Sequence, residues 1–580
     1  MSRAPRNAAA EFRLRSWFVF GLLGFAAAGL AASAVRRQVV ERDFLIGQGE
    51  ARAVREVKIE AHRGAILDRN GRPVAISTPL ESVYAVPREL STAPDRWTEL
   101  AKQLKRNRRE FERRVSSSQD RDFLWLARHL SPAEAAAVQK MNVPGVYTRS
   151  EYRRFYPEGE VLGHVLGFTN QDDQGLEALE LAFDPWLAGE DGAKRVIKDN
   201  NGRRVDDVEN IRAVRPGRDL VLSLDTRFQH LAYRELKRAI EENRATSGSV
   251  VLIDVRTGEV LAMANQPNFN PNDHQQRAKA LSNGWVRNRA VTDMLEPGSS
   301  IKPFVIAAAL ESGRFNSASV IDTGSGYYEV NGVVAKDEHP YGVLPLAGVL
   351  AKSSNVGMAK IARELEPQQL WGTLTRFGFG HVTASQFPGE SAGLLPNYAS
   401  WRWVTVSSLS RGYNMNVTPL QLAQAYATLG GLGVAHPVSL LRVDEEVPGE
   451  RVLAERHART MISLLEAVVK DGTGSRAAIP GYRVAGKTGT AKKTRAGERG
   501  YYDDRYTAVF GGLAPASNPR LAAVVVIDDP RADRFYGGEI AAPVFSAVVG
   551  GALRLMGVAP DAELEGAADP LTGVATMVSR

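Results

Sequence analysis

Two adjacent serines stand just before a lysine in the segment MLEPGSSIKPF, residues 294–304. Ser299 lies three positions before Lys302, so at the start of a helix their side chains share one face within about one turn, whereas Ser300 projects elsewhere. A serine hydroxyl becomes a good nucleophile only when a neighbour accepts its proton. A buried lysine with a lowered pKa can do this without a histidine. The spacing indicates that Ser299 is a nucleophile and Lys302 its base.

A purely structural interpretation competes with this one, in which a serine caps the helix and the lysine is solvated. The pattern S-x-x-K is expected by chance about once in a chain of this length, so alone it is weak. Two further motifs follow: Ser353-Ser354-Asn355 in LAKSSNVGMAK, and Lys487-Thr488-Gly489-Thr490 in RVAGKTGTAKK. A lysine-threonine-glycine triplet is expected in only about one chain in ten of this size. The order of the three motifs is that of penicillin-binding enzymes, and the ordered combination is a strong signal.

The elements around these motifs predict one sheet with helices on it. Residues 247–267 form two β-rich runs joined across Thr257-Gly258, a hairpin signal. Three more strand-like runs come near the end of the chain: RVAGKTGTAKK, RYTAVFGGLAP and RLAAVVVIDDP. Between them the pattern is helical, as in KPFVIAAALESG, which stops at Gly313, and TPLQLAQAYATLGGLG, which has Pro419 near its start. We expect an antiparallel sheet completed by strands from both ends and flanked by helices.

The first half of the chain has a different character. Short strand-like runs (SVYAVP, GVYTRS), the charged helical stretch TELAKQLKRNRREFERRV and turn clusters such as DRNGRP and NNGRR indicate an α+β region. The segment RAVRPGRDLVLSLD changes character, which places a boundary near residue 220. The expected organisation is a cytoplasmic N-terminus (1–15), a transmembrane anchor (16–35), an α+β pedestal domain (36–220), a second domain carrying the three motifs (221–556) and a C-terminal tail (557–580).

The segment Ser16–Val35 contains no charged residue and follows a start rich in arginine. Twenty helical residues span about 30 Å, the thickness of a bilayer's hydrocarbon core. Because Ala32-Ser33-Ala34 resembles a signal-peptide cleavage site, a cleaved secretory signal is the alternative to a retained anchor. The uncharged length favours the anchor. Arginines flank both ends, so the positive-inside rule barely decides the orientation. No second long apolar stretch follows, which limits the chain to one span.

Composition excludes several classes of protein. The chain has 580 residues, 44% of them hydrophobic and 24% charged, and no cysteine, so disulfides, thiolate metal sites and cysteine nucleophiles are ruled out. The net charge of +7 is spread over the whole length without a basic stripe or interleaved aromatics, which argues against nucleic acid. The nine histidines show no H-x-x-x-H or H-E-x-x-H spacing, and we expect neither a metal nor a cofactor.

The chain resembles the class B penicillin-binding proteins, and most closely the division-specific D,D-transpeptidases that cross-link septal peptidoglycan. In the second half the resemblance rests on the three motifs, on NVTPLQLAQAYATL (416–429) and on FYGGEIAAPVF (535–545). In the first half it rests on RGAILDRNGRPVA (63–75), RFYPEGEVLGHVLGFTNQDDQGLE (154–177) and KDNNGR (198–203), which are similar to the family's pedestal motifs. It implies a transpeptidase domain whose antiparallel sheet is flanked by helices.

The resemblance also implies a role for each motif residue. Ser299 attacks the carbonyl of the penultimate D-alanine of a peptidoglycan stem peptide, and Lys302 takes its proton. Ser353 relays a proton to the departing D-alanine, and Asn355 binds the substrate's backbone amide. Lys487 supplies positive potential.

The remaining residues of the third motif bind the substrate in the same comparison. Thr488 and Thr490, with Gly489 between them, bind the terminal carboxylate. The backbone N–H groups of Ser299 and Thr490 form an oxyanion hole. An amine from a neighbouring stem then resolves the acyl-enzyme into a cross-link.

Some residues depart from the family pattern or allow two interpretations. Arg411 and Asn414 stand where the family suggests an aromatic residue and a glycine, which affects the edge of the site and its β-lactam affinity. In the pedestal, Arg63, Arg69 and Glu177 form either a contact surface for partners or, as we favour, structural ion pairs that position the two domains.

Four functions fit the motifs to different degrees. The favoured one is a septal transpeptidase held in the inner membrane with its catalytic domain in the periplasm. β-Lactams are its inhibitors, and a polytopic glycosyltransferase and other division proteins its partners. The alternatives are the elongation-specific relative, a serine β-lactamase or carboxypeptidase, and a non-catalytic division scaffold or β-lactam sensor. The large N-terminal region argues against a hydrolase.

Overall fold

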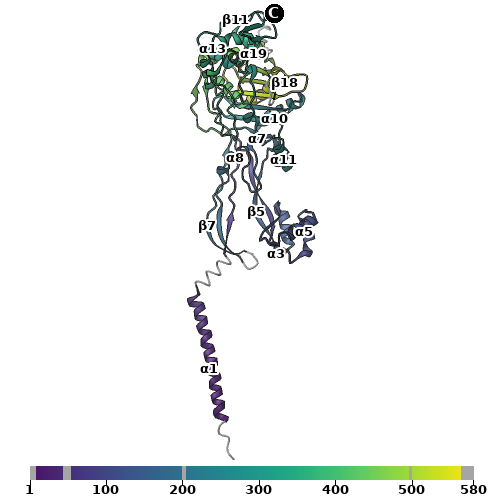
Figure 1. Ribbon diagram of the computed structural model, residues 1–580, viewed down its shortest axis with the longest axis vertical. Helices are drawn as coiled ribbons and strands as arrows, with labels where there is room; N and C mark the ends of the chain where they lie inside the picture. Colours follow the sequence, from purple (N-terminus) through teal and green to yellow (C-terminus); the bar gives the residue numbers. More distant parts are fainter. Residues whose placement is uncertain (1–7, 43–53, 199–203, 446, 496–499, 563–580) are drawn as a thin grey trace, which may run out of the picture. The chain divides into compact units, whose positions relative to one another are not determined.

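The computed structural model describes residues 8–42, 54–198, 204–445, 447–495 and 500–562 (Figure 1). The chain divides into two compact units, residues 1–62 with 189–217, and residues 63–188 with 218–580. The predicted turn NNGRR, and with it most of KDNNGR, lies largely outside the described residues, as do the first seven residues and most of the predicted tail. The expected domain boundaries stay predictions.

The first unit holds the apolar N-terminal helix and a small sheet. Helix α1 (Ala8–Val35) contains the whole predicted span and continues into a π-helical turn, η1 (Arg36–Val40). The apolar segment Phe12–Val40 is long enough to cross a membrane, and none of it is buried against protein. Strands β1 (Val54–Ile59), β6 (Gly192–Lys198) and β7 (Arg204–Arg212) pair antiparallel in the order β1-β6-β7.

The head of the pedestal, residues 63–188, belongs to the second unit. Its long strand β3 (Pro73–Ala85) pairs with β4 (Leu124–Leu130) and with β5 (Val146–Phe155). Helices α4 (Trp97–Gln103), α5 (Arg108–Ser116) and α6 (Pro132–Lys140) cover this sheet through a separate apolar core. The stretch TELAKQLKRNRREFERRV is therefore two helices, because Lys105 adopts a left-handed backbone (φ 54°) and Asn107 caps the second one.

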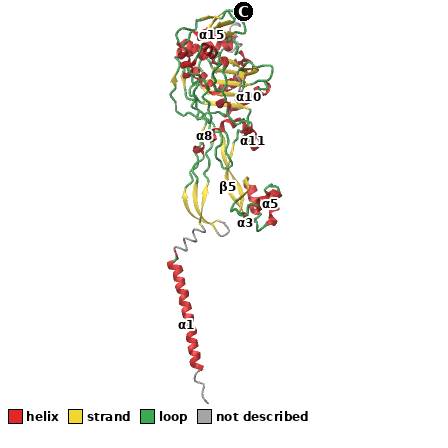
Figure 2. Cartoon of the chain, viewed as in Figure 1, coloured by secondary structure: helices red, strands yellow, loops and turns green. Residues whose placement is uncertain are grey.

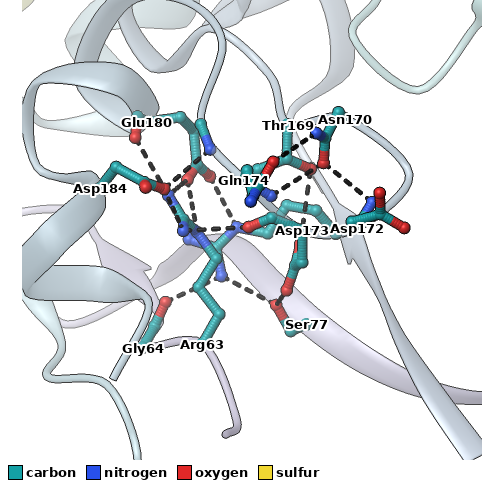
Figure 3. Close-up of polar contacts among 12 residues, drawn as sticks. Arg63, Gly64, Ser77, Thr169, Asn170, Asp172, Asp173, Gln174, Glu180 and Asp184 are labelled. Carbon is teal, nitrogen blue, oxygen red and sulfur yellow. Dashed lines mark hydrogen bonds and ion pairs between the residues drawn. The ribbon is translucent and has the colours of Figure 1, made fainter. Parts of the chain in front are cut away.

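A buried ionic cluster holds the head together (Figure 3). The Arg63 guanidinium donates to the carboxylates of Glu180 (2.7 Å) and Asp184 (2.6 Å), and Arg154 donates to the other oxygen of Glu180 (2.6 Å). Arg63, Arg154 and Glu180 are all buried. Arg63 thus forms structural ion pairs, but its partners Glu180 and Asp184 lie within the head, so these pairs do not join the two domains as we favoured, and Glu177 is not among them.

The predicted sheet of the second half is a five-stranded antiparallel sheet in the order β10-β9-β19-β18-β17. The predicted hairpin supplies β9 (Ser247–Asp254) and β10 (Val260–Gln266). The three runs near the end of the chain supply β17 (Ala485–Thr494), β18 (Tyr501–Ala514) and β19 (Leu521–Asp528). The α+β class and the completion of the sheet from both ends are confirmed.

Helices cover both faces of this sheet (Figure 2). Alternate residues of β9 enter two cores: Val250 and Leu252 pack with α10 (Thr226–Glu242) and α21 (Ala542–Leu555). Val251 and Ile253 face the other way, toward α18 (Pro419–Gly430). Segment Gly537–Leu555 is also apolar enough to span a membrane by composition, but 56% of it is buried here, as suits a core helix.

The elements between the two halves of the sheet carry the remaining motifs. Besides α18, their helices are α11 (His274–Ser282), α12 (Arg289–Thr292), α13 (Lys302–Glu311), α14 (Leu346–Ala351), α15 (Asn355–Arg363), α16 (Pro367–Arg376), α17 (Trp403–Leu409) and α19 (Glu455–Asp471). Their strands are β11 (Val320–Asp322), β12 (Tyr327–Val330), β13 (Val333–Lys336), β14 (Val343–Pro345), β15 (Val434–Ala435) and β16 (Glu450–Arg451). The predicted stop of α13 before Gly313, which has φ 71°, is observed.

Candidate active site

The two serines of the first motif have different environments. Both lie in a 3₁₀ turn, Gly298–Ile301, that leads directly into α13. Ser300 is buried, and its hydroxyl donates to the Pro297 carbonyl (2.6 Å). Ser299 is partly exposed, and its hydroxyl makes no hydrogen bond with any residue that the structure describes. Only Ser299 is therefore free to meet a substrate.

Lys302 opens a helix that is buried on all sides, because KPFVIAAALE is apolar around its whole circumference. Its Nζ lies within hydrogen-bond distance of the Ser353 carbonyl (2.6 Å), Asn355 Oδ1 (3.0 Å) and Ser353 Oγ (3.2 Å). A neutral amine has two N–H donors and one lone pair. The carbonyl and the amide oxygen accept the two donors, which leaves the lone pair available for a hydroxyl proton.

Ser353 occupies the junction between two helices. It follows α14 and adopts a left-handed backbone (φ 55°), after which Ser354 caps α15 by accepting from Gly357 N (2.8 Å). A non-glycine residue in this conformation is strained, and such strain is common where a side chain must be aimed. The turn directs Ser353 Oγ between two amines, Lys302 and Lys487.

The third motif lies on β17, the edge strand of the sheet. Lys487 is fully buried, and its Nζ reaches Ser353 Oγ (3.1 Å) and Thr488 Oγ1 (3.2 Å). Thr490 accepts a hydrogen bond from Gly537 N (3.0 Å). Gly489 passes so close to the catalytic turn that an added Cβ would lie 2.7 Å from the Pro297 carbonyl oxygen. The strand and the turn therefore form two walls of one site.

The two lysines are electrostatically distinct. Burial lowers the pKa of Lys302 well below its ordinary value, and the charges of Lys487 and Arg411 lower it further. Burial alone lowers the pKa of Lys487, to about 7. Two amines that contact the same hydroxyl repel each other when both are protonated, so the doubly protonated state is disfavoured. Positive neighbours add to the effect of burial at Lys302 and not at Lys487, so we expect Lys302 to be the neutral base of the pair and Lys487 the cation.

The site's edge contains both residues that depart from the family pattern. Asn414 has φ 62°, a left-handed conformation that glycine adopts freely and that asparagine tolerates better than most residues. The substitution therefore preserves the backbone. Arg411 donates from Nε to the Ser407 carbonyl (3.0 Å) and forms no ion pair with any described residue. It places an unpaired positive charge beside Lys302.

Sequence reasoning missed several groups that organise the site. Asp337 accepts from Ser354 and from the first amides of α15. Glu296 accepts from Asn414 N (2.9 Å) and the Tyr501 hydroxyl (3.1 Å). Burial raises the pKa of Glu296. Glu296 could have been suspected from its place beside Ser299, whereas Asp337 and Tyr501 reach the site only through tertiary contacts.

Comparison with known proteins identifies the family. The model of the penicillin binding protein transpeptidase domain matches residues 248–550, and that of the penicillin-binding protein dimerisation domain matches residues 58–222. The chain is 43% identical to the peptidoglycan D,D-transpeptidase FtsI of Escherichia coli K12, over 97% of this chain and 95% of the relative. It is 39% identical to the probable peptidoglycan D,D-transpeptidase PbpC of Pseudomonas aeruginosa, over 94% and 96%.

Solved structures agree with this result. The transpeptidase domain of Burkholderia pseudomallei penicillin-binding protein 3 is 38% identical and covers 59% of this chain and 98% of that structure, with a TM-score of 0.54. Penicillin-binding protein 3 of Mycobacterium tuberculosis, solved in complex with aztreonam, is 28% identical over 88% of this chain and 99% of that structure, with a TM-score of 0.68. A dimerisation domain followed by a transpeptidase domain, with the three motifs converging on one site, places this chain among the class B penicillin-binding proteins.

Proposed function

We propose that this protein is a peptidoglycan D,D-transpeptidase that cross-links stem peptides through a serine acyl-enzyme during septal cell-wall synthesis. The observation that carries the proposal is the convergence of two buried lysines on Ser353 Oγ, beside a partly exposed and unbonded Ser299. The septal assignment rests on the near full-length similarity to the relative named FtsI.

In this reaction Ser299 Oγ attacks the carbonyl carbon of the penultimate D-alanine while its proton passes to the lone pair of Lys302 Nζ. The backbone N–H groups of Ser299 and Thr490 hold the developing oxyanion, usually the largest electrostatic contribution in acyl transfer. When the C–N bond breaks, Ser353 relays a proton to the leaving amine of D-alanine. Lys487, Thr488 and Thr490 hold the terminal carboxylate, with Gly489 leaving room between them.

The second half-reaction uses an amine of a neighbouring stem. It attacks the acyl carbonyl, loses a proton to the same basic cluster and releases Ser299. Asn355 binds the donor's backbone amide and keeps the acyl group in place. A β-lactamase needs a base aimed at water to release the acyl group, and in class A enzymes that base is a glutamate. The carboxylate of the catalytic turn, Glu296, is instead engaged by Asn414 and Tyr501.

The cellular context belongs to the same proposal. Helix α1 acts as a single-pass anchor in the inner membrane, with residues 1–15 in the cytoplasm and the pedestal (36–220), the transpeptidase domain (221–556) and the tail (557–580) in the periplasm. Its partners there are a polytopic glycosyltransferase and other division proteins. The uncharged length of the predicted span and its exposure in the structure support the anchor.

Mass spectrometry of the purified protein incubated with a penicillin tests the proposal. A single penicilloyl adduct is expected on Ser299. Ser299→Ala must abolish it, whereas Ser300→Ala, the matched neighbour, must still form it if folded. Adduct on Ser300, or unchanged labelling of Ser299→Ala, would overturn the assignment.

The fate of the adduct separates transferase from hydrolase. With penicillin and no amine acceptor, the acyl-enzyme is expected to persist for many minutes. With a thioester or peptide donor, added D-amino acid is expected to give aminolysis product. Fast release of free penicilloate without any acceptor effect would make the protein a hydrolase.

A further inference from the structure

Asp337 is a buried carboxylate that forms no ion pair with any residue in the described part of the chain. It accepts hydrogen bonds from Ser354 Oγ (2.7 Å), Asn355 N (2.5 Å) and Val356 N (3.0 Å). Only 5% of Asp337 is exposed. A buried charge is costly unless it is well hydrogen-bonded. Here the amides at the start of α15, where the helix dipole is positive, compensate it.

The donors to this carboxylate are interleaved with the catalytic motif. Ser354 separates Ser353 from Asn355, so fixing its hydroxyl fixes both neighbours. The backbone of the preceding strand completes the arrangement, because Asn355 Nδ2 donates to the Lys336 carbonyl (3.1 Å). That bond turns Asn355 Oδ1 toward Lys302, from which it accepts at 3.0 Å.

The hairpin that carries Asp337 is attached to the helix that it caps. Strands β12 and β13 pair with each other, and Ala335 on β13 packs with Val356 and Ala359 of α15 in a small apolar core of its own. Tyr328 of β12 covers that core. Asp337 therefore cannot shift without displacing either its own hairpin or the start of α15.

We propose that Asp337 is a positioning residue for the transpeptidase reaction, whose carboxylate sets the place of Ser353 and Asn355 and balances the positive charges around Lys302. This inference rests on the proposed role of Lys302 as the base. Asp337 belongs to none of the three sequence motifs and lies between the first and the second of them.

The charges that face Lys302 come from three directions. Lys487 on β17 and Arg411 after α17 lower its pKa, whereas Asp337 and then Glu338, after β13, raise it. Glu338 is exposed and therefore screened by water, while Asp337 is buried. Asp337 is thus the main opposing charge, and without it the pKa of Lys302 falls further.

The charge of Asp337 affects the pH at which acylation becomes fast. Acylation requires neutral Lys302, so its rate rises with pH through the pKa of this amine. Removing the negative charge of Asp337 destabilises the protonated amine, and the midpoint of the rise moves to lower pH.

The test is the second-order rate constant for acylation of the full-length protein by a fluorescent penicillin, measured against pH. Asp337→Asn keeps an acceptor for the two amides and removes the charge, so the midpoint of its pH profile must lie at lower pH than that of the wild type. Ser354→Ala removes the hydrogen bond to Asp337 and the one from Gly357 N but keeps the charge of Asp337, so its midpoint must stay at the wild-type pH. Asp337→Ala loses both the negative charge and the acceptor for the two amides. Its midpoint must therefore fall, and its plateau rate must drop below that of Asp337→Asn.

Two variants distinguish a failure of the role of Asp337 from a failure of the role of Lys302. If Lys302→Arg loses acylation while the midpoint of Asp337→Asn stays at the wild-type pH, the role of Asp337 is refuted and that of Lys302 stands. If folded Lys302→Arg acylates normally, the proposed base is wrong. Should Asp337→Asn fail to fold, Asp337→Ser, a smaller neutral acceptor, must show the same shift, and an unshifted midpoint there refutes the inference equally.

Discussion

The chemistry of this site depends on a difference between two lysines. Both are buried and both contact Ser353 Oγ. Burial lowers the pKa of each, but the charges of Lys487 and Arg411 also lower the pKa of Lys302. A protein can therefore place a base and a cation side by side using one residue type. The assignment depends on burial and charge, not on the identity of the side chains.

Lys302→Arg separates the two roles at residue scale. Arginine keeps a positive charge and cannot lose it, so no base remains beside Ser299. We expect the acylation rate to fall about 10²- to 10⁴-fold, the usual contribution of general base catalysis. Stopped-flow measurement with a chromogenic β-lactam checks this, with circular dichroism as the control for folding. Near-normal acylation by the folded variant would contradict the assignment.

Arg411→Gln acts on the same equilibrium with the opposite sign to Asp337→Asn. Arg411 is an unpaired cation that lowers the pKa of Lys302, so its removal raises that pKa. The pH midpoint of acylation is expected to move upward, and the rate below the midpoint to fall. The pH–rate profile measures this. A midpoint that moves downward, or not at all, would show that the guanidinium does not act on Lys302.

At the scale of elements, the site depends on close contacts between backbone segments that are distant in the sequence. The loop after α17 touches the catalytic turn where Gly412, with φ 83°, passes Gly298. A Cβ on Gly412 would lie 2.0 Å from the Gly298 carbonyl oxygen, and Gly298 N donates to the Gly412 carbonyl at 3.1 Å. The position of Ser299 therefore depends on a glycine more than a hundred residues away.

Gly412→Ala tests this contact. Both the left-handed backbone and the clash with Gly298 oppose it, so we expect a loss of several-fold or more in acylation rate together with a lower unfolding temperature. Gly313→Ala is the matched control, since Gly313 has φ 71° with nothing within 4 Å of its added Cβ. Equal losses in the two variants would show that backbone strain alone, and not the contact, matters.

The ionic cluster of the head makes a second prediction at this scale. Glu180→Gln removes the carboxylate that Arg63 and Arg154 share while all three side chains stay buried. Breaking a buried pair in this way typically costs about 3–5 kcal/mol. Chemical denaturation measures the loss. Glu112→Gln, which breaks the exposed pair with Arg108, should change stability little, and a similar loss in both would contradict the argument.

At the scale of the whole molecule, the three catalytic motifs and the apolar N-terminal helix belong to different compact units of the chain. The three motifs lie between residues 299 and 490, all within the second compact unit. The apolar helix α1 belongs to the first unit. Within the second unit, an ion pair connects the head to the main sheet: Arg69 donates to Glu259 in the β9–β10 turn (3.3 Å). The favoured role of Arg69 as a structural ion-pair residue agrees with this contact.

Removal of residues 1–42 tests the anchor. The full chain is expected to leave the membrane only with detergent and to retain its N-terminus, because α1 exposes a continuous apolar surface. The truncated protein should be soluble without detergent and still form the Ser299 adduct. Fractionation and N-terminal sequencing check both statements. A mature protein beginning near Val35 would instead identify the segment as a cleaved signal.

The sequence by itself determined the features that depend on local pattern. β-Rich runs and turn signals predicted the strands of the main sheet, glycine and proline placed the ends of α13 and α18, and spacing selected Ser299 over Ser300. The order of the motifs predicted the family, since short-range spacing encodes which side chains share one face of a turn. The predicted roles of the site residues stay predictions, although the side chains of Lys302, Ser353, Asn355 and Lys487 do lie within hydrogen-bond distance of one another or of a shared partner.

Tertiary structure decided what depends on residues distant in sequence. No local pattern shows that Asp337 caps α15, that Arg63 pairs with Glu180 and not with Glu177, or that Arg411 forms no ion pair with a described residue. The pKa of Lys302 is likewise invisible in the sequence, because burial and four charged neighbours from three different elements set it. Local spacing thus decided which groups are available for the chemistry, and three-dimensional packing decided their charge and position, since electrostatic energy depends on distance and burial and not on order along the chain.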